Sequence, residues 1–266
     1  MQLGDFLNTA IQQLKAAGIE SARLDVLILL EDVLHRDRAS LIAHPEMVLT
    51  QAHIALLNTY ITLRCSHTPL AYIRGKTAFY GRDFIVNTYT LVPRPETEAM
   101  ITILKKLKLP AHPHIADIGT GSGCLGITAA LELPHSEVFL YDTSAAALKV
   151  ASTNARQLGA RVHIAEQDLL TRDAHHYDVI LANLPYVPTT YPVNRAAEHE
   201  PPVALFSGTD GLEHYRRFWQ QVAINQPHYV IAEALLHQHD SLEQLAREAN
   251  YQLSATEGLA QSFILL

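Results

Sequence analysis

The tetrapeptide Asn183-Leu184-Pro185-Tyr186 follows an apolar run at 177–182 that is typical of a buried strand. An amide nitrogen is a poor nucleophile because its lone pair is delocalised, so acceptors for its N–H protons must orient it. The Asn183 side-chain oxygen and the Leu184 backbone carbonyl are two such acceptors, and neither ionises at physiological pH. The ring of Tyr186 can pack on the flat face of the reacting group.

A glycine-rich loop lies upstream, where an apolar run at 114–118 ends. It contains Asp117, Ile118, Gly119, Thr120, Gly121, Ser122 and Gly123. Its glycines let the backbone pass closely beneath a nucleoside-bearing ligand, and a following helix would present free N–H groups. Together with the tetrapeptide, the loop indicates that a methyl donor is brought to an amino group.

Two other interpretations of the loop stay open. Gly121, Gly123 and Gly126 match the GxGxxG fingerprint of dinucleotide-binding proteins, so a nicotinamide cofactor is one alternative. The other alternative is a tight turn that binds no ligand.

Acidic residues follow two further strand-like runs. Asp142 follows the run at 138–141, about twenty residues beyond the loop, as expected for a carboxylate that binds ribose hydroxyls. Asp168 follows the run at 162–165, where an acid can receive an adenine amino group. Asp142 could also cap a helix that starts near Ser144, a role compatible with binding, and Asp168 could be an ordinary loop acid.

Strand-like and helix-like runs alternate from His114 onward, which is typical of a doubly wound α/β sheet. We predict strands at 114–118, 137–141, 161–165, 177–182, 228–232, 251–255 and 262–266. In this fold, ligands bind beyond the carboxyl ends of the strands, where the strand order reverses. The loop, the two acids and the tetrapeptide all follow strands, so we expect them to form one site.

Two other parts are expected before this sheet. Apolar residues recur at helical spacing in 1–70, without a glycine-rich loop, so we predict a helical bundle that guides a partner. Aromatic and β-branched residues alternate around two glycines in 71–92, which predicts a β-hairpin linker. The catalytic domain then takes 93–266 and opens with a helix at about 95–107 that has acids in its first turn.

The composition limits the class of protein. The 266 residues are 48% apolar and 18% charged, as in soluble globular proteins, and no run of about 18 apolar residues indicates a membrane span. Cys65 and Cys124 are too few for a disulfide framework, and the histidine pairs lack a third ligand, so we expect no metal. A net charge of −7 argues against sequence-independent nucleic-acid binding. We expect a cytoplasmic protein and, most simply, a monomer.

Several motifs together resemble the release-factor glutamine methyltransferases of the PrmC/HemK family, which are class I S-adenosylmethionine-dependent methyltransferases. Besides the residues above, the matching segments are 69–73, 79–81, 92–98, 200–201, 204–205, Gly208 and 210–212. The resemblance spans nearly the whole chain. It implies a Rossmann-like, seven-stranded, mostly parallel sheet, preceded by a helical domain that docks the substrate.

The resemblance also implies an activity, namely N5-methylation of the glutamine in the Gly-Gly-Gln motif of class 1 peptide-chain release factors. S-adenosylmethionine would be the methyl donor and S-adenosylhomocysteine the product. The loop at 119–123 would lie beneath the donor's methionine and ribose, and Asp142 would hold the ribose hydroxyls. Asp168 and Leu169 would border the adenine. The tetrapeptide 183–186 would bind the acceptor amide, and Asn183 would touch the donor as well.

Departures from the family pattern keep other functions open. The family's usual tetrapeptide is Asn-Pro-Pro-Tyr, whereas its second position is Leu184 here. The resulting sequence, Asn-Leu-Pro-Tyr, also resembles the motif of ribosomal RNA adenine N6-dimethylases. RNA adenine methylation is therefore an alternative. Leu169 replaces an often aromatic residue, and the segment 257–266 lacks the family's usual Asp and Arg pattern. An inactive scaffold that binds a release factor is a further alternative.

Overall fold

The computed structural model describes residues 1–171 and 175–266, and the chain divides into two compact units. The first unit contains Met1–Gly75 and Asn194–His199, and the second contains Lys76–Val193 and Glu200–Leu266. The buried apolar side chains divide in the same way. One core cluster belongs to the first unit, and the two others belong to the second.

The first unit is helical, as its sequence pattern predicted. Its elements are α1 (Leu3–Ala16), α2 (Ala22–Leu34), α3 (Arg38–Ala43), α4 (Gln51–Cys65), α5 (Leu70–Arg74) and the 3-10 turn η2 (Ala197–His199). The side chains of Asp37 and Thr50 accept backbone N–H groups at the starts of α3 and α4. A largely buried ion pair, 2.7 Å from Arg64 Nε to Asp25 Oδ2, joins α4 to α2.

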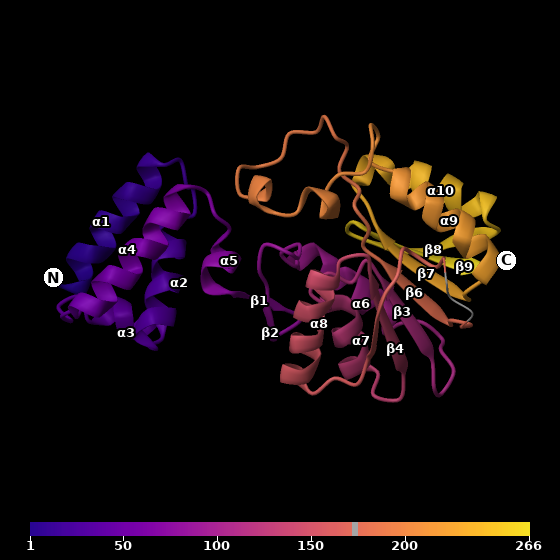
Figure 1. The fold of residues 1–266 in the computed structure, drawn as a ribbon, viewed down its shortest axis with the longest axis horizontal. Coiled ribbons are helices and arrows are strands. Elements are labelled where there is room, and N and C mark those ends of the chain that lie inside the picture. The colour runs from indigo at the N-terminus through magenta and orange to yellow at the C-terminus, as the bar shows by residue number, and fades with distance from the viewer. Residues whose placement is uncertain (172–174) are drawn as a thin grey trace. The chain divides into compact units, whose positions relative to one another are not determined.

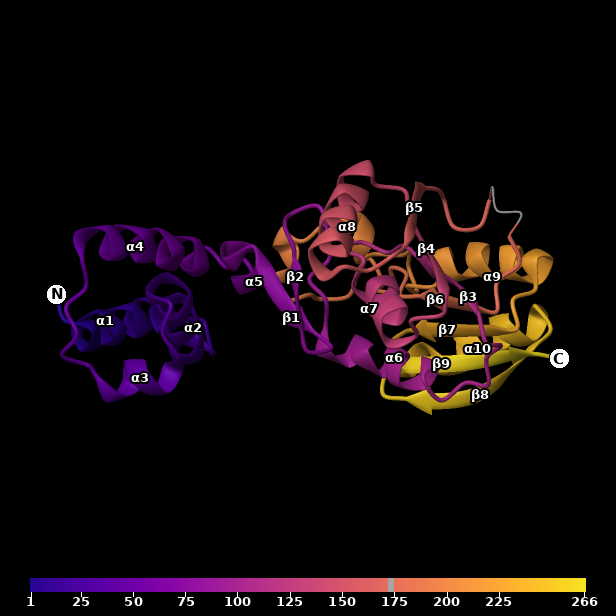
Figure 2. The same ribbon diagram turned by 90° about the horizontal axis from the view of Figure 1, so that it is seen from below.

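A seven-stranded sheet forms the centre of the second unit, in the order β5-β4-β3-β6-β7-β9-β8, which Figure 2 shows from β5 to β8. Its strands are β3 (His114–Ile118), β4 (Glu137–Asp142), β5 (His163–Glu166), β6 (Val179–Ala182), β7 (Tyr229–Glu233), β8 (Tyr251–Glu257) and β9 (Ala260–Leu265). Only the pairs made by β9 are antiparallel within this described sheet. This topology confirms the predicted class I methyltransferase fold, and it departs from the six-stranded order of dinucleotide-binding domains.

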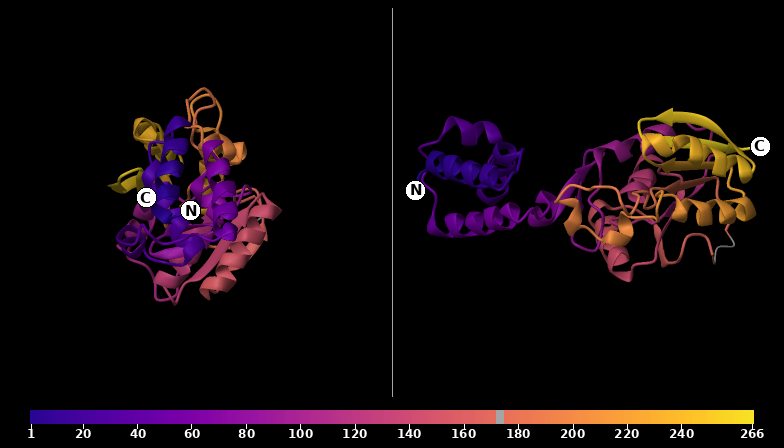
Figure 3. Two further views of the ribbon diagram at one scale, coloured as in Figure 1. Left: turned by 90° about the vertical axis from the view of Figure 1, so that its left-hand side faces the viewer. Right: turned by 90° about the horizontal axis from the view of Figure 1, so that it is seen from above.

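Helices cover both faces of the sheet (Figure 1). α6 (Glu98–Leu104), α7 (Cys124–Glu132) and α8 (Ala145–Leu158) pack on one face, and α9 (Glu213–Asn225) and α10 (His239–Glu248) pack on the other. Successive strand residues point to opposite faces, so Ile115 packs with α6, α7 and α8 while Ala116 packs with α9 and α10. The last two strands form the C-terminal hairpin, drawn in yellow in Figure 3.

The strand order reverses between β3 and β6, because the chain adds β4 and β5 on one side of β3 before it crosses to β6. The register pairs Ile118 of β3 with Tyr141 of β4 and with Ala182 of β6. The glycine loop, Asp142 and Asn183 follow these three residues, so they lie at the same level of the sheet. Ligands of doubly wound sheets bind at this position.

The segment between the helical unit and the sheet differs in detail from the prediction. The hairpin β1 (Lys76–Phe79) and β2 (Arg82–Ile85) is shorter than 71–92, because α5 precedes it and Gly75 ends α5 at a φ of 72°. The helix predicted at 95–107 starts as the 3-10 turn η1 (Pro95–Thr97), and α6 ends at Leu104. After Leu104 the chain tightens into shorter-range bonds, such as Lys106 N to Ile103 O at 2.9 Å. No helix in the described parts of the chain could span a bilayer.

Candidate active site

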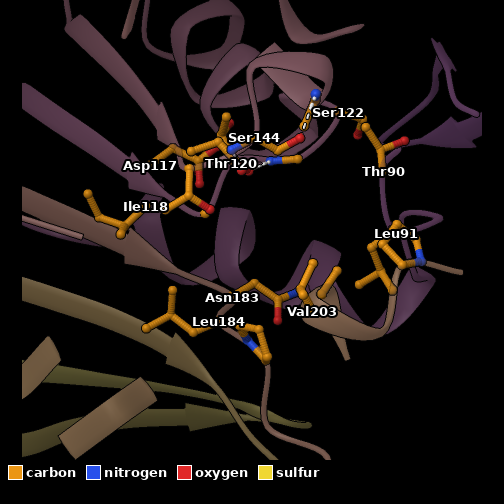
Figure 4. Close-up of a pocket in the computed structure, with 18 of the residues that line it drawn as sticks. Thr90, Leu91, Asp117, Ile118, Thr120, Ser122, Ser144, Asn183, Leu184 and Val203 are labelled. Carbon is orange, nitrogen blue, oxygen red and sulfur yellow. Dashed lines mark hydrogen bonds between the residues drawn. The ribbon is translucent and has the colours of Figure 1, made fainter. Parts of the chain in front are cut away.

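A cavity of about 650 Å³ opens at the carboxyl ends of β3, β4 and β6, a volume that suits a small-molecule ligand. The glycine loop, the residues after β4, β5 and β6, and the segment before α6 form its walls. In Figure 4, Asn183 and Leu184 face Thr120 and Ser122 across this cavity. The fold therefore brings together motifs that lie far apart in the sequence.

The glycine loop turns sharply because Gly119, Gly121 and Gly123 adopt positive φ angles of 71°, 55° and 82°. The residues from Gly119 to Ser122 line the cavity. Gly123, which we expected beneath the ligand, is not among the lining residues of the described chain. A Cβ at this position would lie 2.7 Å from Ile127 Cδ1, so Gly123 allows the loop to pack closely on α7.

Asp117 is a buried carboxyl group at the floor of the cavity. Its Oδ2 accepts hydrogen bonds from Thr120 Oγ1 at 2.5 Å and from Gly126 N at 2.8 Å. It has no cationic partner among the described residues. Burial raises the pKa of Asp117 to about 6, and the nearby charge of Asp142 acts in the same direction. The site therefore favours a ligand that carries positive charge.

Asp142 is the second acid of the cavity and is partly buried. Its two oxygens accept the N–H groups of Gly121 at 2.9 Å and Ser144 at 2.8 Å, which links the glycine loop to the end of β4. Burial raises the pKa of Asp142, although these backbone hydrogen bonds oppose the rise. Ser144, and not Asp142, caps α8, because its Oγ accepts the N–H of Ala147 at 3.2 Å. The capping alternative for Asp142 was therefore wrong.

Asp168 and Leu169 line the cavity beyond β5. The Asp168 carboxylate is about half exposed and forms an ion pair with Arg217 of α9, so its charge is already compensated. Leu169 is buried and adopts a φ of 51°, which is unusual for a residue other than glycine. Gln167 Nε2 donates to the Leu169 carbonyl at 2.9 Å and holds this turn.

The tetrapeptide after β6 divides between the cavity and the core. Asn183, Leu184 and Pro185 line the cavity, whereas Tyr186 is not among its lining residues in the described chain. Leu184 is buried, and its Cδ2 would lie 3.3 Å from a Cβ at Gly119. The leucine thus packs against the glycine loop.

The segment before α6 is held against the cavity by Glu200, which is buried. Glu200 Oε2 accepts the N–H of Val92 at 3.0 Å, and its Oε1 accepts Arg94 Nη2 at 2.5 Å. Pro93, Arg94 and Thr97 from this segment line the cavity. Residues 200–201 and 92–98, which carried part of the family resemblance, are therefore joined by an ion pair.

Two residues that the sequence pattern did not indicate support the Tyr186 end of the tetrapeptide. Glu233 Oε1 accepts the Tyr186 hydroxyl at 2.9 Å, and Gln238 Nε2 donates to the carbonyls of Tyr186 and Asp210, each at 2.8 Å. Glu233 ends an apolar strand, as Asp142 does, so its position was a usable signal. The sequence around Gln238 carried no comparable signal. Among the described residues, no three His, Cys, Asp or Glu side chains could hold a metal ion.

Comparisons with known proteins agree with this geometry. The chain matches the PrmC N-terminal domain over residues 5–75 and the methyltransferase small domain over residues 96–199. It is 37% identical over 228 residues to a release factor glutamine methyltransferase of Koribacter versatilis, covering 84% of this chain and 81% of the relative. A release factor glutamine methyltransferase of Coxiella burnetii is 39% identical over 207 residues, or 76% of this chain and 73% of the relative. The solved hMettl16 catalytic domain shares the fold, with a TM-score of 0.57 at 15% identity over 90% of each chain. The chain belongs to the family of release factor glutamine methyltransferases.

Proposed function

We propose that this methyltransferase transfers the methyl group of S-adenosylmethionine to N5 of the glutamine in the Gly-Gly-Gln motif of class 1 peptide-chain release factors. The observation that carries the proposal is the position of Asn183, whose carboxamide borders a cavity that is also lined by the buried Asp117 and the partly buried Asp142. Relatives named release factor glutamine methyltransferases support a glutamine amide as the acceptor.

The cavity residues fit S-adenosylmethionine because its sulfonium and ammonium groups complement the two uncompensated acids. Gly119 to Ser122 would lie beneath its methionine and ribose. Asp142 would bind the ribose hydroxyls, since each carboxylate oxygen can accept more than one hydrogen bond. Asp168 and Leu169 would border the adenine. When bound, this donor supplies a methyl carbon that is already strongly electrophilic.

The acceptor amide needs orientation more than it needs a base. Asn183 Oδ1 and the Leu184 carbonyl would accept its two N–H protons and favour the positive charge that builds on the nitrogen as its lone pair leaves conjugation. Pro185 would shape the mouth of the cavity. Tyr186 is not among the residues that line the cavity in the described chain, and its ring would lie against the flat face of the acceptor amide. The excess proton can leave to water after transfer, so no catalytic His or Glu is required.

The remaining features of the proposal concern the protein's partners. The helical first unit would dock the release factor. We propose a cytoplasmic monomer that does not bind nucleic acid directly, and the net charge of −7 supports the last point.

Transfer of tritiated methyl groups tests the proposal with three acceptors: a release factor, its Gly-Gly-Ala version and ribosomal RNA. We expect label on the release factor alone, and none on the Gly-Gly-Ala version. Label on RNA would favour the adenine methyltransferase alternative. Donor binding without label on any acceptor would favour the inactive scaffold.

Asn183→Ala tests the acceptor site in the same assay. Losing one oriented acceptor costs on the order of a hundredfold in turnover, so we expect most activity to disappear. Calorimetric titration should still detect S-adenosylmethionine binding, because the glycine loop and the acids are unchanged. A variant that retains the wild-type rate would refute the role of Asn183.

A further inference from the structure

A buried carboxyl group that the proposed chemistry does not use lies behind the loop at 183–186. Glu233 ends β7, is about 1% exposed, and forms no ion pair with any residue that the structure describes. Its Oε1 accepts the Tyr186 hydroxyl at 2.9 Å, while its Oε2 is buried without a hydrogen-bond partner. A buried acid that lacks a cation and one partner costs free energy, so its presence calls for a function.

The neighbour of Glu233 in the sheet is the residue that we expect to hold the acceptor amide. The register pairs Ala182 with Ala232, which puts Asn183 beside Glu233 at the next position. Asn183 Nδ2 donates to Oγ1 of the buried Thr97 at 3.2 Å. Burial raises the pKa of Glu233, and the nearby polar groups of Thr97, Tyr186 and Asn183 oppose the rise. Among the described residues only the Tyr186 hydroxyl forms a hydrogen bond with the carboxyl group, so Oε2 remains an unused acceptor near Thr97 and Asn183.

The charge of Glu233 decides which end of the Asn183 side chain faces the cavity. The two ends of an amide have nearly the same shape, so only their partners select an orientation. A threonine hydroxyl donates or accepts and permits both orientations. A carboxylate only accepts, so it favours Nδ2 directed toward Thr97 and Glu233 and Oδ1 directed toward the cavity.

We propose that Glu233 is a positioning residue that holds the Asn183 carboxamide with its oxygen toward the acceptor amide. The inference rests on the proposed function, because a reversed Asn183 would present its own N–H groups to those of the substrate glutamine. Glu233 thus acts through Asn183 and touches neither donor nor acceptor.

Glu233→Met tests this role, because it removes both acceptor oxygens at a similar side-chain length. Glu233→Met also removes the partner of the Tyr186 hydroxyl, so some loss of stability is expected from this hydrogen bond alone. We expect kcat for release-factor methylation to fall roughly tenfold or more in the folded variant, with the donor Kd unchanged. Tyr186→Phe removes the same hydrogen bond but keeps Glu233, so it should lower kcat less. A Glu233→Met variant with wild-type kcat, or a Tyr186→Phe variant with an equal loss of kcat, would overturn the proposal.

The hydroxyl of Thr97 provides a matched pair of variants. Thr97→Ser retains the hydroxyl and should keep kcat near the wild-type value, whereas Thr97→Val removes it and should lower kcat as Glu233→Met does. Equal activity of the two variants contradicts the link from Glu233 through Thr97 to Asn183.

A measurement that does not need activity distinguishes this inference from the proposed function. In isotope-labelled protein, the Nδ2 protons of Asn183 should exchange slowly with solvent in the wild type and rapidly in Glu233→Met. Equal exchange in both proteins overturns the positioning role, whatever their activity. If the wild type transfers no methyl group but its Asn183 Nδ2 protons still exchange more slowly than those of Glu233→Met, the positioning role is supported and only the proposed function is refuted.

Discussion

At the scale of residues, the cavity combines two kinds of polar group with different tasks. Asp117 is a buried acid and Asp142 a partly buried one, and the hydrogen-bond partners of both are neutral N–H and O–H groups. Asn183 is a neutral carboxamide, and its orientation matters more than its charge. Because burial raises the pKa values of the acids, ligand binding and proton binding at the site are coupled.

Donor affinity should therefore depend on pH. The pKa of Asp117 is about 6 in the free protein, so this group is mostly protonated at lower pH and mostly ionised at higher pH. A cationic donor favours the ionised form, so its binding releases a proton and strengthens as pH rises through this value. We expect the Kd for S-adenosylmethionine to fall about tenfold across two pH units centred on that pKa.

Calorimetric titration at several pH values measures this effect, and Asp117→Asn provides the control. The variant keeps an oxygen for the Gly126 N–H but cannot ionise, so its Kd should change less with pH. The remaining slope would come from Asp142, whose pKa is also raised by burial. A wild-type Kd that is constant over this range would contradict the coupling.

At the scale of elements, the loop after β6 is held by segments that meet around Tyr186. Tyr215 of α9 bridges the ends of β6 and β7, with its hydroxyl 2.8 Å from the Ala182 carbonyl and 2.6 Å from the Glu233 carbonyl. Gly211 approaches the loop so closely that a Cβ there would lie 2.1 Å from the Tyr186 carbonyl oxygen. The position of the site therefore depends on the packing of α9 and α10 against the sheet.

Gly211→Ala should displace this loop. The added methyl group meets backbone at Tyr186 and the Gln238 side chain, and the residue has a φ of 80°. We expect a loss of about 1–3 kcal/mol in the free energy of unfolding from overpacking, together with a large loss of methyl transfer. Denaturant unfolding and the methylation assay measure the two effects.

Gly159→Ala is the matched control, because Gly159 also has a positive φ, of 71°, but no atoms within 4 Å of its Cβ position. It should show the cost of backbone strain alone, about 1 kcal/mol, with activity retained. Equal losses of stability and activity in the two variants would show that contact with Tyr186 is not the cause.

At the scale of the whole molecule, the chain has two units with separate cores. The core of the first unit is drawn from residues 3–61, whereas the clusters of the second begin at Phe79. The cavity is lined only by residues of the second unit within the described chain. Donor binding should therefore stabilise the two units unequally.

Differential scanning calorimetry should resolve two unfolding transitions, of which S-adenosylmethionine shifts only one. At a donor concentration of one hundred times Kd, the second unit should gain about 2.7 kcal/mol, while the helical unit should keep its Tm. Asp142→Asn, which weakens the expected ribose contact, should reduce the shift. A single transition that moves as a whole would show that the two cores unfold together.

Local patterns were sufficient to predict the fold and the neighbourhood of the site. The runs at 114–118 and 177–182 predicted β3 and β6, because apolar strands bounded by turn residues are a local signal. Asp142, Asp168 and Asn183 follow strands, and a parallel sheet brings its carboxyl ends to one edge. Their convergence on one cavity therefore followed from the sequence.

The sequence by itself determined the class of fold, the family and the strand ends that carry polar residues, because these depend on periodicity and short motifs. Only the tertiary structure decided the direction of each side chain. It turned Gly123 and Tyr186 away from the cavity wall and brought Glu233 and Thr97 to Asn183. Such contacts depend on strand register and on packing between distant segments, and neither leaves a pattern in neighbouring residues.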